Sequence, residues 1–207
     1  MRIHVLPALT AACLVLPSCA QFLQAAWTPP NPHASAAPAG HYVVEPAHTQ
    51  VVFSVLHMGF THFTGTFSDA SGSLDFSPTS AKDMAATISV PVASVSTTSP
   101  KLTEELKAAD WLDAAHYPAM VFHSTKVTQT GPDSATVAGL LTLHGVTHPL
   151  VLHATFNGAG VNILDQKETI GFQLTGTLNR SDYGVTKYVP LIGNEITLTI
   201  AAAFEKD

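Results

Sequence analysis

Cysteine and basic residues are scarce in this sequence. Only two cysteines occur among the 207 residues, Cys13 and Cys19, and both lie within the first 20 positions. The rest of the chain cannot form an internal disulfide, so its stability must come from core burial and strand pairing. Nine Lys and Arg face fifteen Asp and Glu, a formal charge of −6, and no basic run occurs. This balance argues against a nucleic-acid partner, because phosphate backbones attract clustered positive charge.

Local motifs of catalysis and metal binding are also missing. The sequence has no Gly-x-Ser-x-Gly elbow and no glycine-rich phosphate loop. Eleven histidines are present, but none forms a His-x-His pair, and His144 and His148 flank a predicted turn. We therefore expect no metal, no cofactor and no enzyme activity, although scattered Ser, His and Asp side chains could still meet in space.

The first 20 residues have the layout of a secretory signal. Arg2 precedes an apolar stretch from Val5 to Leu16, and Pro17-Ser18-Cys19-Ala20 follows. The stretch is too short and too interrupted by proline for a spanning helix, which needs about 20 mostly apolar residues. The segment predicts export, with a periplasmic location.

Two fates of Cys19 stay open. Leu16 to Cys19 is similar to a bacterial lipobox, which predicts lipidation of Cys19 and a membrane anchor. The alternative is ordinary cleavage near Ala20 and loss of Cys19. Residues 21–40 contain the Pro- and Ala-rich stretch TPPNPHASAAPAG, which predicts a linker between this signal and a domain spanning residues 41–207.

From residue 40 onward, apolar and polar residues alternate with a period of two. Nine such runs are separated by Gly, Pro, Asn, Asp and Ser, which predicts an antiparallel all-β sandwich or barrel. One segment, Thr98 to Ala109, instead places Leu102 and Leu106 at helical spacing, which predicts a short amphipathic helix with Pro100 at its first position. The runs are Thr49–Met58, Phe63–Phe67, Gly72–Phe76, Met84–Val92, Met120–Val127, Ala135–Leu143, Val146–Phe156, Thr169–Leu178 and Ile196–Phe204.

The sharpest local signal is LTLHGVTHPL, residues 141–150. A two-residue turn at His144-Gly145 would join its two alternating halves, because Gly accepts a positive φ freely and His tolerates one. Such a hairpin pairs Leu141 with His148 and places Thr142 opposite Thr147.

This hairpin resembles the signature of the YceI-like family of polyisoprenoid-binding, lipocalin-like proteins. Four further family-like pieces follow the same order along the chain. The resemblance implies an antiparallel β-barrel of about eight strands that holds an amphipathic isoprenoid lipid. The four pieces are Tyr42 and His48 with VVFSVLHMGF, GTFSDASGSLDF, WLDAAHYPAMVFHSTKV and LNRSDYG.

Strand parity selects the side chains that face inward. An apolar inner face fits both a packed core and an open cavity, and the family resemblance favours the cavity. Two alternatives stay open for His57: its side chain contacts the head group of the ligand, or it is a buried imidazole that is hydrogen-bonded to the backbone. Arg180 and Asp182 are expected to fix a turn. The expected lipid contacts are Val51, Phe53, Val55, His57, Phe67, Leu141, Leu143, Leu150, Leu152, Phe172, Leu174 and Leu198.

The function expected from the resemblance is binding, sequestration or transport of a long-chain isoprenoid in the cell envelope, such as a polyprenyl phosphate or a quinone-like lipid. The family commonly has an Arg-Asp and a His-Leu pair where this chain has Leu102-Thr103 and Glu105-Leu106. Two alternatives stay open: an envelope interaction module with a packed core, and an isoprenoid-modifying enzyme. The sequence also leaves open whether the protein is a monomer or a homodimer.

Overall fold

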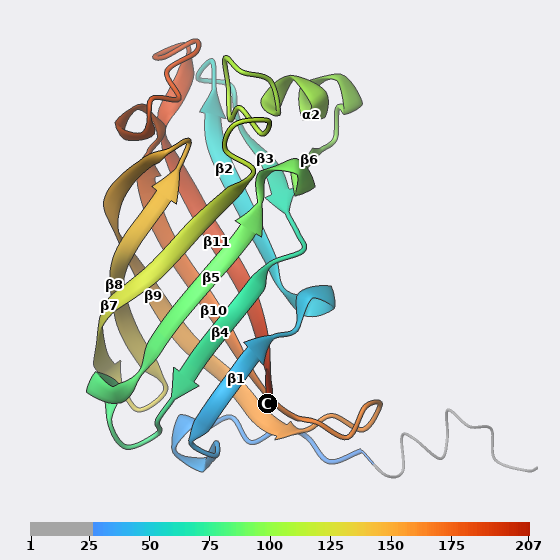
Figure 1. Cartoon of the computed structure of the whole chain (residues 1–207), viewed down its shortest axis with the longest axis vertical. Helices are drawn as coiled ribbons and strands as arrows, with labels where there is room; N and C mark the ends of the chain where they lie inside the picture. The colour runs from blue at the N-terminus through green and yellow to red at the C-terminus, as the bar shows by residue number, and fades with distance from the viewer. Residues whose placement is uncertain (1–26) are drawn as a thin grey trace, which may run out of the picture.

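A computed structural model describes residues 27–207 as an antiparallel β-barrel with one α-helix (Figure 1). Eight strands close the barrel in the order β1-β4-β5-β7-β8-β9-β10-β11, because β1 pairs with both β4 and β11. These strands are β1 (Gly40–Val44), β4 (Ser71–Phe76), β5 (Ala85–Pro91), β7 (Ala119–Gly131), β8 (Ser134–Leu143), β9 (Val146–Val161), β10 (Glu168–Asn179) and β11 (Ile192–Lys206). The all-β barrel expected from the sequence is confirmed.

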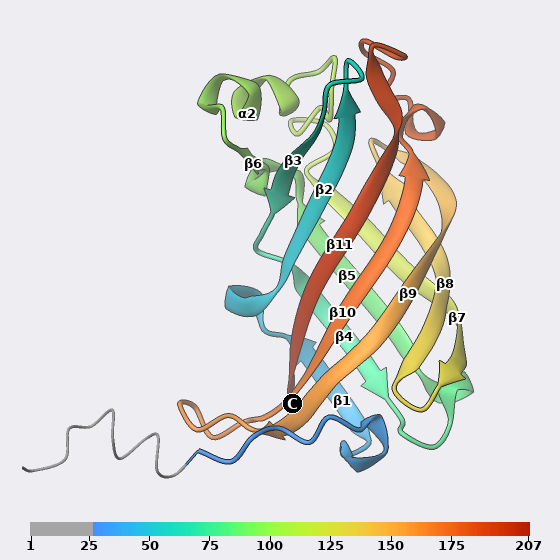
Figure 2. The same cartoon turned by 180° about the vertical axis from the view of Figure 1, so that it is seen from behind.

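Three further strands extend the sheet along β11, whose two halves have different partners. Residues Ile192 to Ala201 of β11 pair with β2 (Gln50–His57), whereas Phe204 to Lys206 pair with β1. β2 continues into β3 (Thr61–Phe67), which pairs with the two-residue β6 (Ser96–Thr97). The two views in Figures 1 and 2 show β2 and β3 continuing the barrel wall beside β11.

The two ends of the barrel differ. We call one end the mouth: it carries the β2–β3 turn, the β8–β9 turn, α2 (Pro100–Leu106) and the segment 180–191 (Figure 1). The other end, the base, carries β1, the β9–β10 turn and the C-terminus (Figure 2). Short 3-10 helices lie in the connections: η1 (Ala34–Ala36), η2 (Pro46–His48), η3 (Ala81–Asp83), η4 (Val92–Ser94) and η5 (Arg180–Tyr183).

The predicted hairpin is present. β8 and β9 pair through Leu141 with His148 and through Thr142 with Thr147, whose hydroxyl oxygens lie 2.7 Å apart. His144 and Gly145 have φ values of 51° and 74°, the left-handed pair that a tight hairpin turn requires.

The predicted helix is present but shorter than expected. It begins at Pro100, where the Ser99 hydroxyl accepts a hydrogen bond from the Leu102 amide, and it ends at Leu106. Lys107 and Ala108 donate to carbonyls only three residues back, which tightens the chain into turns. The strands β1 and β6 were not predicted, because five and two residues carry little periodic signal.

The predicted linker is wrong for its second half, which belongs to the barrel. Asn31 pairs with Ala159 of β9, the Ala34 amide donates to Asp133 over 2.7 Å, and Ala37 is buried. These contacts satisfy backbone groups that composition alone leaves unassigned. The domain therefore begins before residue 41. The predicted signal peptide, Cys19 and residues 21–26 lie outside the described residues.

A packed aromatic cluster fills the base. The rings of Phe76 and Phe156 lie 6.2 Å apart between centroids, and Phe156 meets Phe172 edge to face at 5.4 Å. Tyr42 and Ile170 are fully buried in the same cluster. A second cluster, built on Leu141, Leu143, Leu150, Leu152, Tyr183 and Leu198, lies toward the mouth.

Candidate functional site: an apolar cavity in the barrel

An internal cavity of about 430 Å³ lies within the barrel. Its volume is in the range of natural small-ligand pockets, about 300 to 1,000 Å³. Tyr42, Phe76, Phe156 and Ile170 belong to the base cluster without lining the cavity, so they form a packed floor beneath it. The cavity is therefore closed toward the base and extends toward the mouth.

All twelve side chains selected by strand parity lie on the cavity wall. The register explains why: Leu198 of β11 is paired with Phe53 of β2, and two residues further on Ile200 is paired with Val51. A period of two keeps such pairs on one face, and Thr197 and Thr199 alternate with them on the other. Contact of these residues with a lipid stays a prediction.

The wall also contains residues that the sequence analysis missed. Met84, Ala86 and Ile88 line the cavity from β5 and the residue before it, and the parity of the run Met84–Val92 could have identified them. Leu112, Val185 and Tyr188 come from irregular segments at the mouth, where no periodic pattern exists to reveal them.

Arg180 is buried at the mouth and lines the cavity. Its guanidinium donates from Nε to the Gly193 carbonyl at 2.8 Å, and from its two Nη atoms to the Val185 and Ile192 carbonyls at 2.9 Å each. Burial lowers its pKa from the ordinary value. The expectation that Arg180 fixes this turn is confirmed. Asp182 is exposed, and none of the three hydrogen bonds of the Arg180 guanidinium within residues 27–207 involves it.

Trp111 joins the two irregular segments that surround the mouth. Its indole N–H donates to Glu105 at 3.1 Å, and its ring packs against Tyr188, with 6.0 Å between the ring centroids. Lys187 donates to Glu105 at 3.1 Å and to Asp110 at 2.6 Å. Hydrogen bonds from Lys187 and then Trp111 lower the pKa of Glu105, and the bond to Asp110 raises the pKa of Lys187. These contacts attach α2 and its following turns to residues 180–191.

His57 lies at the edge of the mouth. It lines the cavity, yet its side chain is exposed, because it is the last residue of β2 and pairs with Ile192, the first residue of β11. The alternative of a buried imidazole bonded to the backbone is therefore wrong. The exposed position leaves the ring able to meet a polar group that projects from the cavity.

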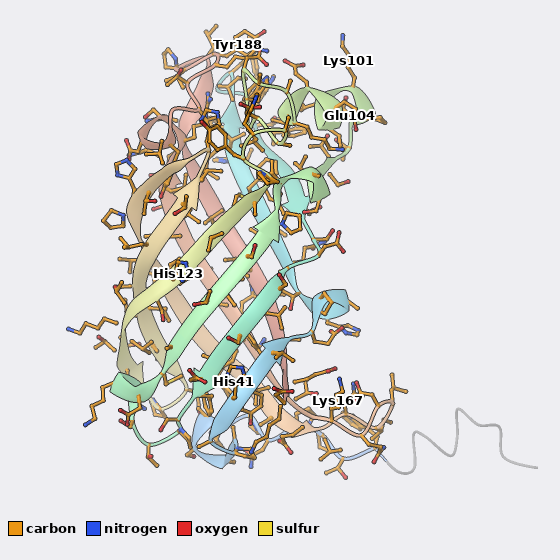
Figure 3. The ribbon with its side chains drawn as sticks, in the orientation of Figure 1. His41, Lys101, Glu104, His123, Lys167 and Tyr188 are labelled. Atoms are coloured by element: carbon orange, nitrogen blue, oxygen red, sulfur yellow. The ribbon has the colours of Figure 1, made fainter. Side chains whose placement is uncertain are left out.

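Few polar groups reach the cavity, and most charged side chains lie elsewhere. Figure 3 shows His123 on the barrel wall, Lys101 and Glu104 on α2, and His41 and Lys167 near the base. Within residues 27–207, no group of three or more His, Cys, Asp or Glu is arranged to hold a metal ion. In the same part of the chain, no helix has the length and apolar character needed to cross a membrane.

The fold and the cavity define a class: a lipocalin-like antiparallel barrel with an apolar cavity that is closed at the base. The chain belongs to the YceI-like domain family, which matches residues 42–204. The resemblance identified from the sequence motifs is thus confirmed. A relative from Pseudomonas savastanoi pv. phaseolicola, a UPF0312 protein, is 38% identical over 154 residues, which cover 73% of this chain and 80% of the relative.

Solved structures share this barrel. The YCEI protein of Campylobacter jejuni has a TM-score of 0.65 and 29% identity, covering 73% of this chain and 89% of that one. A polyisoprenoid binding domain from Saccharophagus degradans has a TM-score of 0.61 over 82% of this chain and 100% of that domain. Its 13% identity makes it similar in fold alone.

Proposed function

We propose that this protein binds a long-chain isoprenoid or a similar amphipathic lipid, with the apolar chain in the cavity and the polar head at the mouth. The observation that carries the proposal is the 430 Å³ cavity with its almost wholly apolar wall and packed floor. The polyisoprenoid binding domain of the Saccharophagus protein has the same fold, which supports the choice of ligand class.

The energetics favour an apolar chain over a polar metabolite. Each methylene moved from water into such a wall contributes about 0.8 kcal/mol, and ordering the chain offsets part of this gain. Selection would then depend on cavity length and width. The head group would lie near His57, Arg180 and Trp111, the polar or aromatic side chains at the open end.

We infer binding and carriage in preference to catalysis. Two polar wall residues already bond other protein groups: Glu105 accepts from Trp111 and Lys187, and Arg180 donates to three carbonyls. His57 also lines the cavity but lies exposed at its edge, where it can contact a head group. A general acid, base or nucleophile needs a free atom aimed at the reacting bond. The secretory layout of residues 1–20 supports a carrier in the cell envelope.

Extraction of the natural ligand tests the proposal. The full chain is purified from cells without detergent and extracted with organic solvent, and the extract is analysed by mass spectrometry beside an extract of a soluble protein of similar size. A long-chain isoprenoid enriched over the control is the expected result. If no lipid is enriched, and the purified protein takes up neither an added polyprenol nor an added quinone, the proposal is wrong.

A further inference from the structure

Large apolar side chains are exposed around the mouth. We call six of them the apolar rim: Leu56, Met58, Phe60, Tyr188, Val189 and Leu191. Phe60 is 82% exposed and Leu191 63%, values far above those of the buried leucines of the barrel wall. The β2–β3 turn and the segment 188–191 are held together by the Met58 amide, which donates to the Leu191 carbonyl at 2.9 Å. The rim is thus one surface built from the end of β2, the β2–β3 turn and the segment 188–191.

The rim is continuous with the cavity. His57, Tyr188 and Ile192 line the cavity, and their neighbours Met58 and Leu191 are exposed outside it. Apolar surface therefore runs from the interior to the outer tips without a charged side chain, because residues 58–60 and 188–191 contain none. Figure 3 shows Tyr188 at this end of the barrel. A lipid could leave or enter here while remaining in contact with apolar groups.

The charge around the rim indicates what kind of surface it fits. Lys187, the nearest cation in sequence, already binds Glu105 and Asp110, and the chain as a whole carries a formal charge of −6. Attraction to an anionic membrane needs free basic residues. Uncharged tips with an aromatic hydroxyl suit the interface of a neutral bilayer, where Tyr is enriched and no charge has to be desolvated.

We infer that the apolar rim docks onto a zwitterionic bilayer without net charge and inserts Phe60 and Leu191, so that the lipid passes directly between membrane and cavity. This inference rests on the proposed function, since a carrier of a water-insoluble ligand must exchange it with a membrane. Exposed apolar patches on soluble domains mark such contact surfaces. The two tips lie on different turns at the mouth, so each can enter a fluid surface beside the opening.

Vesicle binding tests the inference with a matched control. Full chains that all carry Cys19→Ser, which removes any acyl anchor, are floated with phosphatidylcholine vesicles. The rim variant is Phe60→Ser with Leu191→Ser, and the control is Leu164→Ser, which removes a 76% exposed leucine from the β9–β10 turn at the base. We expect the rim variant to lose about tenfold or more in vesicle affinity, because two apolar insertions are removed, and the control to bind like the parent.

A second measurement separates docking from cavity binding. The rate at which a fluorescent polyprenol moves from vesicles into the barrel should fall in the rim variant, while its equilibrium occupancy stays equal to that of the parent. Equal flotation of the parent and the rim variant would overturn the inference. So would loss of binding in Leu164→Ser alone, binding only to anionic vesicles with reversal by salt, or light scattering that shows the rim holding two copies of the chain together. Vesicle binding without any polyprenol uptake would instead refute the proposed function and leave the docking surface standing.

Discussion

Replacing Leu141 with Trp distinguishes an open cavity from a packed core. Leu141 is buried on the inner face of β8 and lines the cavity. In a packed core the larger ring would cost about 1 to 3 kcal/mol, because neighbouring side chains and the backbone must shift. In a cavity the ring occupies empty space. If the extra atoms of the Trp ring fill about a tenth of the 430 Å³ cavity, they fill about 43 Å³. At about 24 cal/mol per Å³, filling that volume would stabilise the fold by about 1 kcal/mol. The expected change in the free energy of unfolding therefore differs in sign between the two cases.

The assay compares Leu141→Trp with Leu140→Trp, which places the same ring at the adjacent exposed position of β8. Unfolding by urea is measured on delipidated protein, because a bound lipid would itself stabilise the folded state. Lipid occupancy is measured separately by native mass spectrometry. We expect Leu141→Trp to keep or gain stability and to lose lipid, and Leu140→Trp to change neither. A loss of 1 to 3 kcal/mol with unchanged occupancy would refute the cavity assignment.

Three further predictions concern the mouth, the base and the amino terminus. Arg180→Gln should lower the free energy of unfolding in urea by about 3 kcal/mol, about 1 for each carbonyl left unpaired. Tyr183→Phe in the same turn should cost less than Arg180→Gln, because no protein group within residues 27–207 forms a hydrogen bond with its buried hydroxyl. Hydrogen bonds from the Ala34 amide and then from His33 lower the pKa of Asp133 from 3.8. The stabilisation of residues 31–39 by the Asp133 carboxylate should therefore be present above pH 4 and be lost as the pH falls through the lowered pKa. Hydrogen exchange of residues 31–39 measured against pH checks this, and Asp133→Asn should remove the pH dependence. Finally, Cys19 should carry the acyl group of a membrane anchor, and in fractionated cells the native chain should appear with membranes and Cys19→Ser in the soluble fraction; equal soluble amounts of both would contradict this.

The barrel could be predicted because its long strands repeat a simple pattern. β9 and β10 alternate apolar and polar residues along most of their length, and the turn at His144-Gly145 fixes the register of one hairpin. Every strand with an apolar inner face contributed residues to the cavity wall. The same pattern could not separate a cavity from a packed core, because both require an apolar inner face, and only the spacing of the strands in three dimensions decides between them.

The two ends of the barrel could not be predicted from periodicity. At the base, residues 31–39 pack against the barrel and contact Asp133 and Ala159, which lie more than 90 positions away in the chain. At the mouth, Arg180 and Trp111 hold irregular segments through side-chain bonds to carbonyls and carboxylates. Long-range contacts of this kind leave no repeating signal in the sequence, so a Pro- and Ala-rich composition predicts a free linker where the structure has a packed segment.

The packing of residues 31–39 on the base decides which way an anchored barrel would face. Only twelve residue steps separate Cys19 from Asn31, and a fully extended chain of that length reaches about 40 Å. A tilted sixteen-residue strand such as β9 spans about the same distance along the barrel axis. A barrel acylated at Cys19 would therefore stand on its base, with the mouth pointing away from its own membrane unless the whole tether were stretched. Such a protein would exchange lipid with the facing membrane or with a second carrier, and the difference between its two ends would make this transport directional.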